Sequence, residues 1–220
     1  KWQLEYLRRF SKKLIFDFDD AIMYKDSNSS IQISYSLERK FKAVIKKADL
    51  IITGNEYLKE KALKYNKNVV ILNTPVDTDF YYQKDYHIKT NILTLGWIGS
   101  KSTLIYLKDL LPVFEKLSAR FDNLQLKIVC NDFFDCSTMS IVKKQWNFEE
   151  EVLDLHSFDI GLAPLRNDIF TKGKCGYKIL QYMACGLPVV CSPVGINSEI
   201  VDEGINGFYA VTIEEWVEKL

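Results

Sequence analysis

The sequence has no excess of charge of either sign, because its 29 lysines and arginines balance its 29 aspartates and glutamates. That balance argues against a general nucleic-acid-binding protein, which would show a basic footprint, although a local basic pocket stays open. No apolar run approaches the ~20 residues that a membrane-spanning helix needs. The chain also begins without an initiator methionine or a signal peptide and opens inside a helical pattern, so we expect a fragment.

Histidine and paired cysteines are also scarce. The chain has two histidines, His87 and His156, and an odd number of cysteines, five, with no Cys-x-x-Cys pair among them. So few soft ligands argue against a zinc site and favour reduced thiols in a cytoplasmic protein. We therefore expect no bound metal, and the Ser, Cys and His residues form no catalytic triad pattern.

The usual phosphate-binding motifs are missing as well. A P-loop built on Gly173-Lys174 would need a glycine five positions earlier and a Ser or Thr directly after, but these positions hold Asp168 and Cys175. The Gly-x-Gly-x-x-Gly fingerprint of dinucleotide-binding proteins does not occur anywhere. These absences argue against a P-loop that cradles ATP and give no support to a dinucleotide site.

What the chain does contain is a repeated alternation of strand and helix patterns. In the first part, amphipathic helical spacing over residues 2–10, 36–48 and around residues 57–62 alternates with apolar strand patterns at 14–18 and 49–53 and in "NVVILNTPVD", which starts at Asn68 and is closed by Pro75. This order predicts a parallel sheet with helical crossovers, that is, an α/β fold. A polar, aromatic stretch without a period follows, and then the pattern restarts. We predict one α/β unit over residues 1–78, a connection over 79–90 and a second unit over 91–220.

The second unit opens with a strand that ends in Gly96-Trp97-Ile98-Gly99-Ser100. A helical pattern then runs over residues 103–119, and Pro112 predicts a break inside it. Glycines between a strand and a helix can bring backbone N–H groups close to a phosphate. A tight turn also needs glycine, so Gly99 and Ser100 leave both interpretations open.

The strongest candidate for an anion site is the stretch "GKCGYKILQYMACGLPVV", residues 173–190. Gly176 stands where a helix is expected to begin, so the N–H groups of the first turn and the positive end of the helix dipole are available. Lys174 and Lys178 add full charges. The pattern favours a diphosphate there, and the alternative is a simple helix start with solvated lysines.

Three further groups of charged residues have open interpretations. Arg166 and Asp168 follow a buried strand over 158–165, and ligands of open α/β sheets bind beyond the carboxyl ends of strands. Asp17, Asp19 and Asp20 also follow a strand, where a metal or an acceptor hydroxyl competes with a solvated strand end. The basic face near the N-terminus could touch anionic lipid or be solvated; it is formed by Arg8, Arg9, Lys12 and Lys13.

The segments "FDIGLAPL" and "GKCGYKILQYMACGLPVVCSPVGINSEIVDEGINGF" resemble the donor-binding part of glycosyltransferase group 1, the retaining sugar-nucleotide transferases of GT-B fold. In that family a helix of the type Glu-Ala-Met-Ala-x-Gly-x-Pro-Val-Val is followed by a glycine-containing loop, a Glu and a Gly-x-x-Gly turn. Here the helix pattern falls on residues 181–190, and the later positions are Gly195, Glu199, Gly204 and Gly207. "ADLIITGNEYL" and "TPVDTDFY" resemble the end of the family's first domain and its hinge.

The resemblance implies two Rossmann-like domains with parallel sheets. Residues 1–78 would be the last part of the acceptor-side domain, which is incomplete, and residues 91–220 the donor domain without its final helices. A nucleotide-diphosphate sugar would be the donor substrate, with no cofactor and no metal. The acceptor would be a glycan or a lipid-linked sugar.

The chain departs from the family at its two glutamates, which fall on Gly173 and Gln181. Asp168 is the candidate replacement for the first, and Gln181 can hydrogen-bond a ribose hydroxyl without charge. The family's basic residues after the first donor-domain strand fall near Trp97 and Ser102, which leaves the diphosphate to Lys174 and Lys178, with Lys101 a weaker candidate. We predict Asp168 and Lys174 as catalytic residues. The predicted donor-binding residues are Gly99, Ser100, Lys174, Gly176, Tyr177, Lys178 and Gln181.

The sequence thus predicts a retaining glycosyltransferase, and the family suggests bacterial polysaccharide or lipopolysaccharide assembly, in the cytoplasm or on the inner face of the membrane. Two alternatives stay open. A sugar-nucleotide epimerase of the same fold would need an acid or base at the sugar, and neither His87 nor His156 has a supporting motif. A non-catalytic nucleotide-binding module would be consistent with the missing glutamates.

Overall fold

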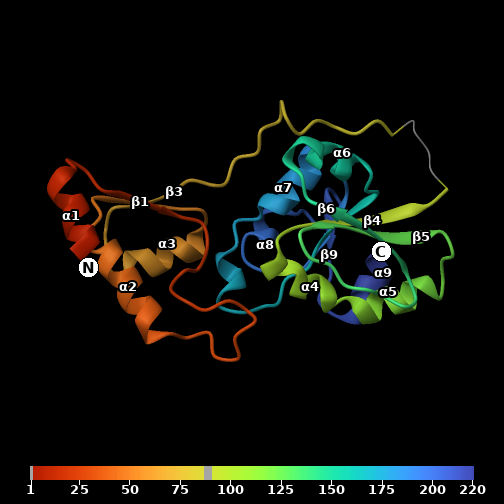
Figure 1. The fold of residues 1–220 in the computed structure, drawn as a ribbon, viewed down its shortest axis with the longest axis horizontal. Coiled ribbons are helices and arrows are strands. Elements are labelled where there is room, and N and C mark those ends of the chain that lie inside the picture. The colour runs from red at the N-terminus through yellow and green to blue at the C-terminus, as the bar shows by residue number, and fades with distance from the viewer. Residues whose placement is uncertain (1, 87–90) are drawn as a thin grey trace. The chain divides into compact units, whose positions relative to one another are not determined.

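The computed structural model describes residues 2–86 and 91–220, which form two parallel β-sheets with helical connections (Figure 1). The chain divides into two compact units. Unit 1 comprises Lys1–Thr74, Arg166–Cys175 and Val194–Ile196, and unit 2 comprises Pro75–Leu165, Gly176–Pro193 and Asn197–Leu220. The α/β class with parallel sheets is confirmed. The boundaries at residues 78 and 91 stay a prediction, and residues 87–90 of the predicted connection lie outside the described part.

Unit 1 has a three-stranded parallel sheet of order β1-β2-β3. Its elements are α1 (Trp2–Phe10), β1 (Ile15–Phe18), α2 (Tyr35–Ile45), β2 (Leu50–Thr53), α3 (Glu56–Leu63), β3 (Val69–Ile71) and the short η3 (Thr171–Gly173). Phe41 and Ile45 of α2 and Leu58 of α3 pack on Phe18 and Ile51 of the sheet to form its core. Both helices begin at capping side chains, because Ser34 accepts from the Leu37 N–H and Asn55 accepts from the Leu58 N–H.

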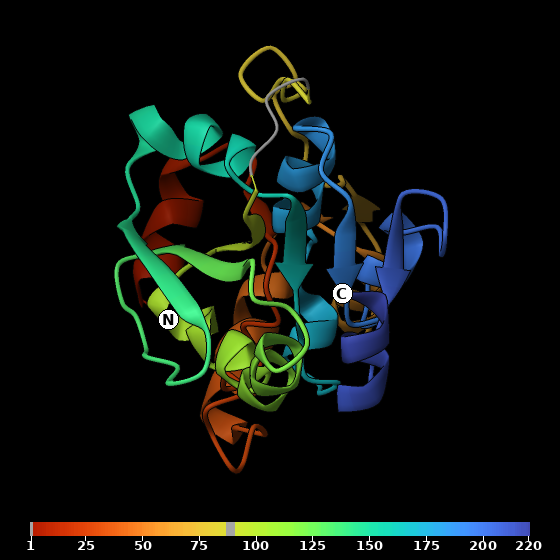
Figure 2. The same cartoon turned by 90° about the vertical axis from the view of Figure 1, so that its right-hand side faces the viewer.

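Unit 2 has a six-stranded parallel sheet of order β6-β5-β4-β7-β8-β9, whose strands lie side by side in Figure 2. Its strands are β4 (Leu93–Ile98), β5 (Leu124–Cys130), β6 (Ser140–Gln145), β7 (Ile160–Ala163), β8 (Val189–Cys191) and β9 (Gly207–Tyr209). Its helical elements are η1 (Lys101–Thr103), α4 (Leu104–Lys108), α5 (Leu111–Ser118), η2 (Phe148–Glu150), α6 (Glu151–His156), α7 (Tyr177–Ala184), α8 (Asn197–Ile200) and α9 (Ile213–Lys219).

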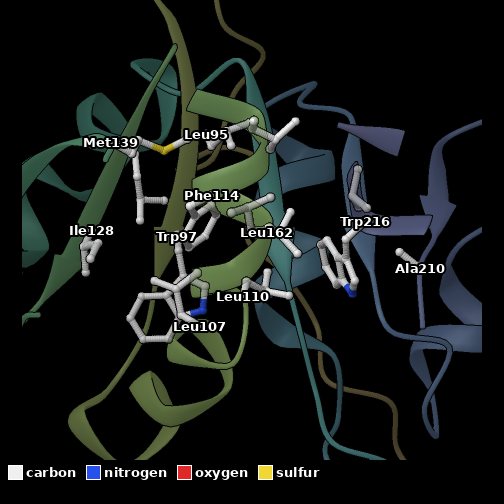
Figure 3. Close-up of a cluster of buried hydrophobic side chains, with 14 of the residues drawn as sticks. Leu95, Trp97, Leu107, Leu110, Phe114, Ile128, Met139, Leu162, Ala210 and Trp216 are labelled. Carbon is white, nitrogen blue, oxygen red and sulfur yellow. The ribbon is translucent and has the colours of Figure 1, made fainter. Parts of the chain in front are cut away.

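Two hydrophobic clusters cover the two faces of this sheet. On one face Leu95 and Trp97 of β4 pack with side chains of α4, α5 and α9, and Figure 3 shows Trp97 beside Leu107 and Phe114. On the other face Phe158 and Tyr182 belong to a second cluster that includes residues of α6 and α7. Alternate residues of each strand point to opposite faces, so both faces can be apolar.

The predicted break near Pro112 is confirmed. Helix α4 ends at Lys108 and α5 begins at Leu111, with Pro112 in its first turn. Proline is tolerated there because the N–H groups of a first turn have no acceptor within the helix.

Strand β6 and helix α6 were not predicted from the sequence. Among the described strands, β6 pairs with β5 alone, at the edge of the sheet, and it carries an exposed Lys143 and a partly exposed Lys144. Lysines are common on edge strands because they discourage pairing with other chains, but they also hide the apolar alternation that identifies a strand.

Gly96 serves packing inside β4. A Cβ atom at this position would lie 1.8 Å from the ring of Phe158. The glycine is therefore needed so that Phe158 can cover the sheet, and the turn into the next helix begins only after Ile98.

Candidate functional site

The first part of the candidate site follows the carboxyl end of β4. Gly99 donates its N–H to the Val129 carbonyl oxygen at 3.1 Å, and Ser100 donates its N–H to Thr103 Oγ1 at 3.2 Å. A Cβ atom at Gly99 would lie 2.6 Å from the Trp97 ring. These contacts show that Gly99 and Ser100 form a tight turn that leads into η1. Their role in donor binding stays a prediction.

The second part is the start of α7. Gly176 has φ 72° and ψ 9°, in the left-handed region that only glycine adopts without strain. Its carbonyl oxygen accepts from the N–H groups of Ile179 and Leu180 at 2.9 and 3.2 Å. The first N–H groups of a helix have no intrahelical acceptor, and the helix dipole places positive charge at the same end.

Lys178 connects these two parts. Its Nζ lies 4.0 Å from the centroid of the Trp97 ring, in a cation–π contact. Trp97 is fully buried, and its Nε1 has no hydrogen-bond partner among the described residues. The indole ring of β4 therefore contacts both Gly99 and Lys178, so the structure brings these two predicted donor-binding residues to the same place.

Gln181 lies inside unit 2, next to a buried carboxylate. Its Nε2 donates to Glu151 Oε1 at 2.7 Å and to Tyr81 Oη at 2.9 Å. The Tyr81 hydroxyl also donates to Glu151 Oε1, and Trp146 Nε1 donates to Glu151 Oε2. Burial, and next the hydrogen bond to Glu151, raise the pKa of Tyr81 far above its ordinary value. Neither Glu151 nor Tyr81 belongs to a sequence motif, because only the fold brings them to Gln181.

Tyr177 is the first residue of α7 and is partly exposed, at 42%. Its Oη lies 3.1 Å from Tyr81 Oη. Tyr177 and Gln181 are therefore joined through Tyr81, and both predicted donor-binding residues belong to one hydrogen-bonded network.

Asp168 and Lys174 belong to unit 1. Asp168 Oδ1 accepts from the N–H groups of Phe170 and Thr171, both at 2.9 Å. Burial acts to raise the pKa of Asp168, but hydrogen bonds from Ser27 and from these N–H groups outweigh it and hold the pKa below its ordinary value. Lys174 Nζ lies 2.9 Å from Asp20 Oδ1. The catalytic roles of Asp168 and Lys174 stay predictions.

The remaining polar candidates make local contacts. Arg166 donates to the Ser27 carbonyl oxygen at 3.1 Å, and His156 Nε2 lies 2.8 Å from the Tyr82 carbonyl oxygen. His87 lies outside the described residues. Within residues 2–86 and 91–220, no group of three or more His, Cys, Asp or Glu side chains, Asp17 and Asp19 included, is arranged to hold a metal ion.

The N-terminal helix is short. Arg8, on its basic face, hydrogen-bonds Asp49 through both terminal nitrogens. In the described part of the chain, no helix has the length and apolar character needed to cross a membrane.

Solved structures similar to this chain share its fold. HepE from Anabaena, in complex with UDP and glucose, aligns with a TM-score of 0.72 at 15% identity, over 97% of this chain and 62% of that one. Sucrose-phosphate synthase from Thermosynechococcus elongatus gives 0.76 at 14% identity, over 99% and 59%. A glycosyltransferase from Rickettsia africae gives 0.68 at 13% identity, over 99% and 62%. The chain spans about three fifths of the length of these proteins.

These structures have the GT-B arrangement of Rossmann-like units, so the predicted fold is confirmed. No curated protein matches the sequence. Residues 93–220, which include the start of α7 and the whole of the six-stranded sheet, match the family described as glycosyl transferases group 1. Because this match covers more than half of the chain, the protein belongs to the glycosyl transferases group 1 family.

Proposed function

We propose that this chain binds a nucleotide-diphosphate sugar through unit 2 and forms the donor side of a retaining glycosyltransferase. The observation that carries the proposal is the start of α7, where a left-handed Gly176 precedes the helix and Lys178 is held over the Trp97 ring. Membership of the glycosyl transferases group 1 family supports sugar transfer as the reaction class.

The chemistry of the transfer explains why such a site is useful. When the sugar leaves, negative charge grows on the diphosphate. Donors and cations that are already in place stabilise that charge without rearranging, and such electrostatic stabilisation is often the largest contribution to an enzyme's rate. The first N–H groups of α7, its dipole and Lys178 supply this stabilisation with no metal ion. Lys174 and Asp168, which precede α7 in the sequence, are the proposed catalytic residues.

UDP is the first nucleotide to test, since HepE was solved with UDP and glucose. The proposed acceptor is a glycan or a lipid-linked sugar of bacterial polysaccharide or lipopolysaccharide assembly. Peripheral contact with the inner face of a membrane is proposed for the basic N-terminal residues Arg9, Lys12 and Lys13, which are exposed.

Calorimetric titration with UDP-glucose, GDP-mannose and ADP-glucose tests the proposal. We expect one of them to bind, and we expect Lys178→Gln to weaken that binding roughly tenfold or more, because a hydrogen bond to a charged group contributes about 1.5–3 kcal/mol. Lys116→Gln is the matched control, since Lys116 lies in α5 and pairs with Glu214. Absence of binding by all three sugar nucleotides would rule out the donor site.

A further inference from the structure

The hydrogen-bonded network around Glu151 consists of Tyr81, Trp146, Tyr177 and Gln181, and it fixes which group is the donor in each of its hydrogen bonds. Glu151 begins α6 and is only 5% exposed. Three donors surround its carboxylate, namely Tyr81 Oη and Gln181 Nε2 on Oε1 and Trp146 Nε1 on Oε2. An ionised carboxylate can only accept hydrogen bonds, so every partner must point a hydrogen towards it.

The direction of the next bond follows from that constraint. Tyr81 has one hydroxyl hydrogen, and it is donated to Glu151. The Tyr81 oxygen can then only accept, and it does so from Gln181 Nε2 at 2.9 Å. The contact of 3.1 Å between the Tyr81 and Tyr177 hydroxyls, in which the distance alone leaves the donor open, must therefore have Tyr177 as the donor.

Tyr177 is thus left with lone pairs but no hydrogen for a ligand. Its side chain is 42% exposed at the first position of α7, so a bound molecule can reach it. A lone pair attracts hydroxyl or N–H groups and repels the oxygens of a phosphate. The Tyr177 hydroxyl therefore suits the sugar parts of a nucleotide sugar and not its diphosphate.

We propose that Glu151 acts through Tyr81 to make Tyr177 a hydrogen-bond acceptor for a hydroxyl group of the bound nucleotide sugar. The inference rests on the proposed donor site at the start of α7. Tyr177 would touch the ligand, and Glu151 and Tyr81 would be positioning residues.

The same network explains why an amide stands at position 181, where the family resemblance places a glutamate. Both contacts of Gln181 Nε2, to Glu151 and to Tyr81, need a donor. A carboxylate there has no hydrogen to give and would face the Glu151 carboxylate. The carboxylate of this network is therefore supplied by Glu151 of α6, and Gln181 of α7 supplies the amide that donates to it.

Tyr177→Phe tests the contact with the ligand, because it removes only the hydroxyl group. UDP and UDP-glucose are titrated by calorimetry against the wild-type chain and the variant. We expect roughly fivefold weaker binding, the ratio for a neutral hydrogen bond of about 1 kcal/mol. A loss with both probes assigns the contact to a ribose hydroxyl, and a loss with UDP-glucose alone assigns it to the hexose; either supports the proposal. Unchanged binding of both probes overturns it.

Tyr86→Phe is the matched control. Tyr86 has a similar exposure, and its hydroxyl donates to the Gly186 carbonyl oxygen just beyond the other end of α7. Its loss removes a hydroxyl from the same unit without touching the network, so binding should stay at the wild-type value. If Tyr86→Phe weakens binding as much as Tyr177→Phe, the effect is not specific to the network and the proposal fails.

Glu151→Gln and the exchange Glu151→Gln/Gln181→Glu test the positioning role. The single variant frees the direction of the Tyr81 hydrogen, so binding should weaken as in Tyr177→Phe. The exchange restores a carboxylate beside Tyr81 and an amide that can face both it and Trp146, so wild-type affinity should return. Thermal melting checks that each variant folds, and if the single variant does not fold, the exchange alone decides.

The outcomes separate the two proposals. An exchange variant that folds but binds several-fold more weakly than the wild-type chain overturns the role of Glu151, and so does a folded Glu151→Gln that binds normally. A wild-type chain that binds none of UDP-glucose, GDP-mannose and ADP-glucose overturns the proposed donor site, and the role of Tyr177 falls with it.

Discussion

The ammonium group of Lys178 lies 4.0 Å from the centroid of the Trp97 ring, so a side chain of β4 fixes a cation at the start of α7. The indole is fully buried on its other sides by the cluster that includes Leu107 and Phe114. A flexible lysine loses side-chain entropy when it binds an anion, and a lysine already held against a ring has less to lose. The contact therefore prepares Lys178 for a ligand.

Trp97→Phe should weaken the cation–π contact that holds Lys178 in place, without abolishing it. Phenylalanine offers a smaller ring face and a poorer cation–π partner than tryptophan. We expect UDP-glucose affinity to fall severalfold, less than in Lys178→Gln, and the free energy of unfolding to fall by roughly 1–3 kcal/mol, as for core substitutions generally. Calorimetry and urea denaturation measure the two effects. A variant that binds as tightly as the wild-type chain would show that the ring does not assist Lys178.

Gln181→Glu should destabilise unit 2 in a pH-dependent way. The introduced carboxyl would face Glu151 at about the 2.7 Å that now separates their polar atoms. Breaking a buried charged network in this manner costs roughly 3 kcal/mol at neutral pH.

The sign of the pH effect follows from proton binding. Two adjacent carboxyl groups share a proton, so the folded variant keeps a proton that the unfolded chain releases above about pH 4.3. The folded state then binds more protons, and the free energy of unfolding falls as pH rises. Urea titrations at pH 4.5 and pH 7.5 should show the larger loss at the higher pH, and an equal loss at both would contradict the pairing.

Gly96→Ala should be among the most damaging single-methyl changes in the chain, because the added carbon would lie 1.8 Å from the Phe158 ring. We expect the free energy of unfolding to fall by about 3 kcal/mol, the upper part of the range for overpacked cores. Gly204→Ala is the control for backbone strain alone, since φ is 78° there and no atom lies within 4 Å of the added carbon. Its expected cost is about 1 kcal/mol.

A second substitution makes this test specific. If Phe158→Leu recovers part of the loss in Gly96→Ala, the two positions are coupled through space. Strictly additive losses would argue that the strand tolerates the methyl group by moving elsewhere.

Asp49→Asn should remove part of the acid sensitivity of unit 1. The hydrogen bond from Arg8, then the N–H of Leu14, lower the pKa of Asp49 from 3.8 to about 2. Between these values the unfolded chain binds the proton and the folded chain does not, so stability is lost as pH falls. Denaturation midpoints between pH 4 and pH 2 should therefore decline less steeply in Asp49→Asn than in the wild-type chain. Parallel declines would mean that the pair does not survive in solution.

The sequence predicted those features that depend on neighbouring residues. Pro112 indicates a helix break because the missing N–H is a local property, and Gly176 indicates a helix start for the same kind of reason. The order of strands and helices follows from local periodicity and implied a parallel sheet. The edge strand with Lys143 and Lys144 escaped prediction because its solvent exposure removes the apolar pattern.

The candidate site was harder to predict, because its contacts join distant segments. Tyr81 is 70 residues from Glu151 and 100 residues from Gln181, and no spacing rule connects them. Gln181 was recognised as a departure from the family, but its partner could be found only when the fold placed α6 beside α7. The glycine spacing at Gly96 and Gly99 indicates a turn, but the Phe158 ring that requires Gly96 lies on a different segment.

The division of the chain into interleaved units has a consequence for synthesis on the ribosome. The Tyr57 hydroxyl donates to the Ile169 carbonyl oxygen, 112 residues later in the chain, and Asn55 donates to the Lys174 carbonyl oxygen, 119 residues later. Most of unit 2 is therefore translated before unit 1 receives its last segments, Arg166–Cys175 and Val194–Ile196. Domains commonly fold one after another as they emerge. Asn55 and Tyr57 of unit 1 therefore lack these acceptors until the loop after β7 has left the exit tunnel.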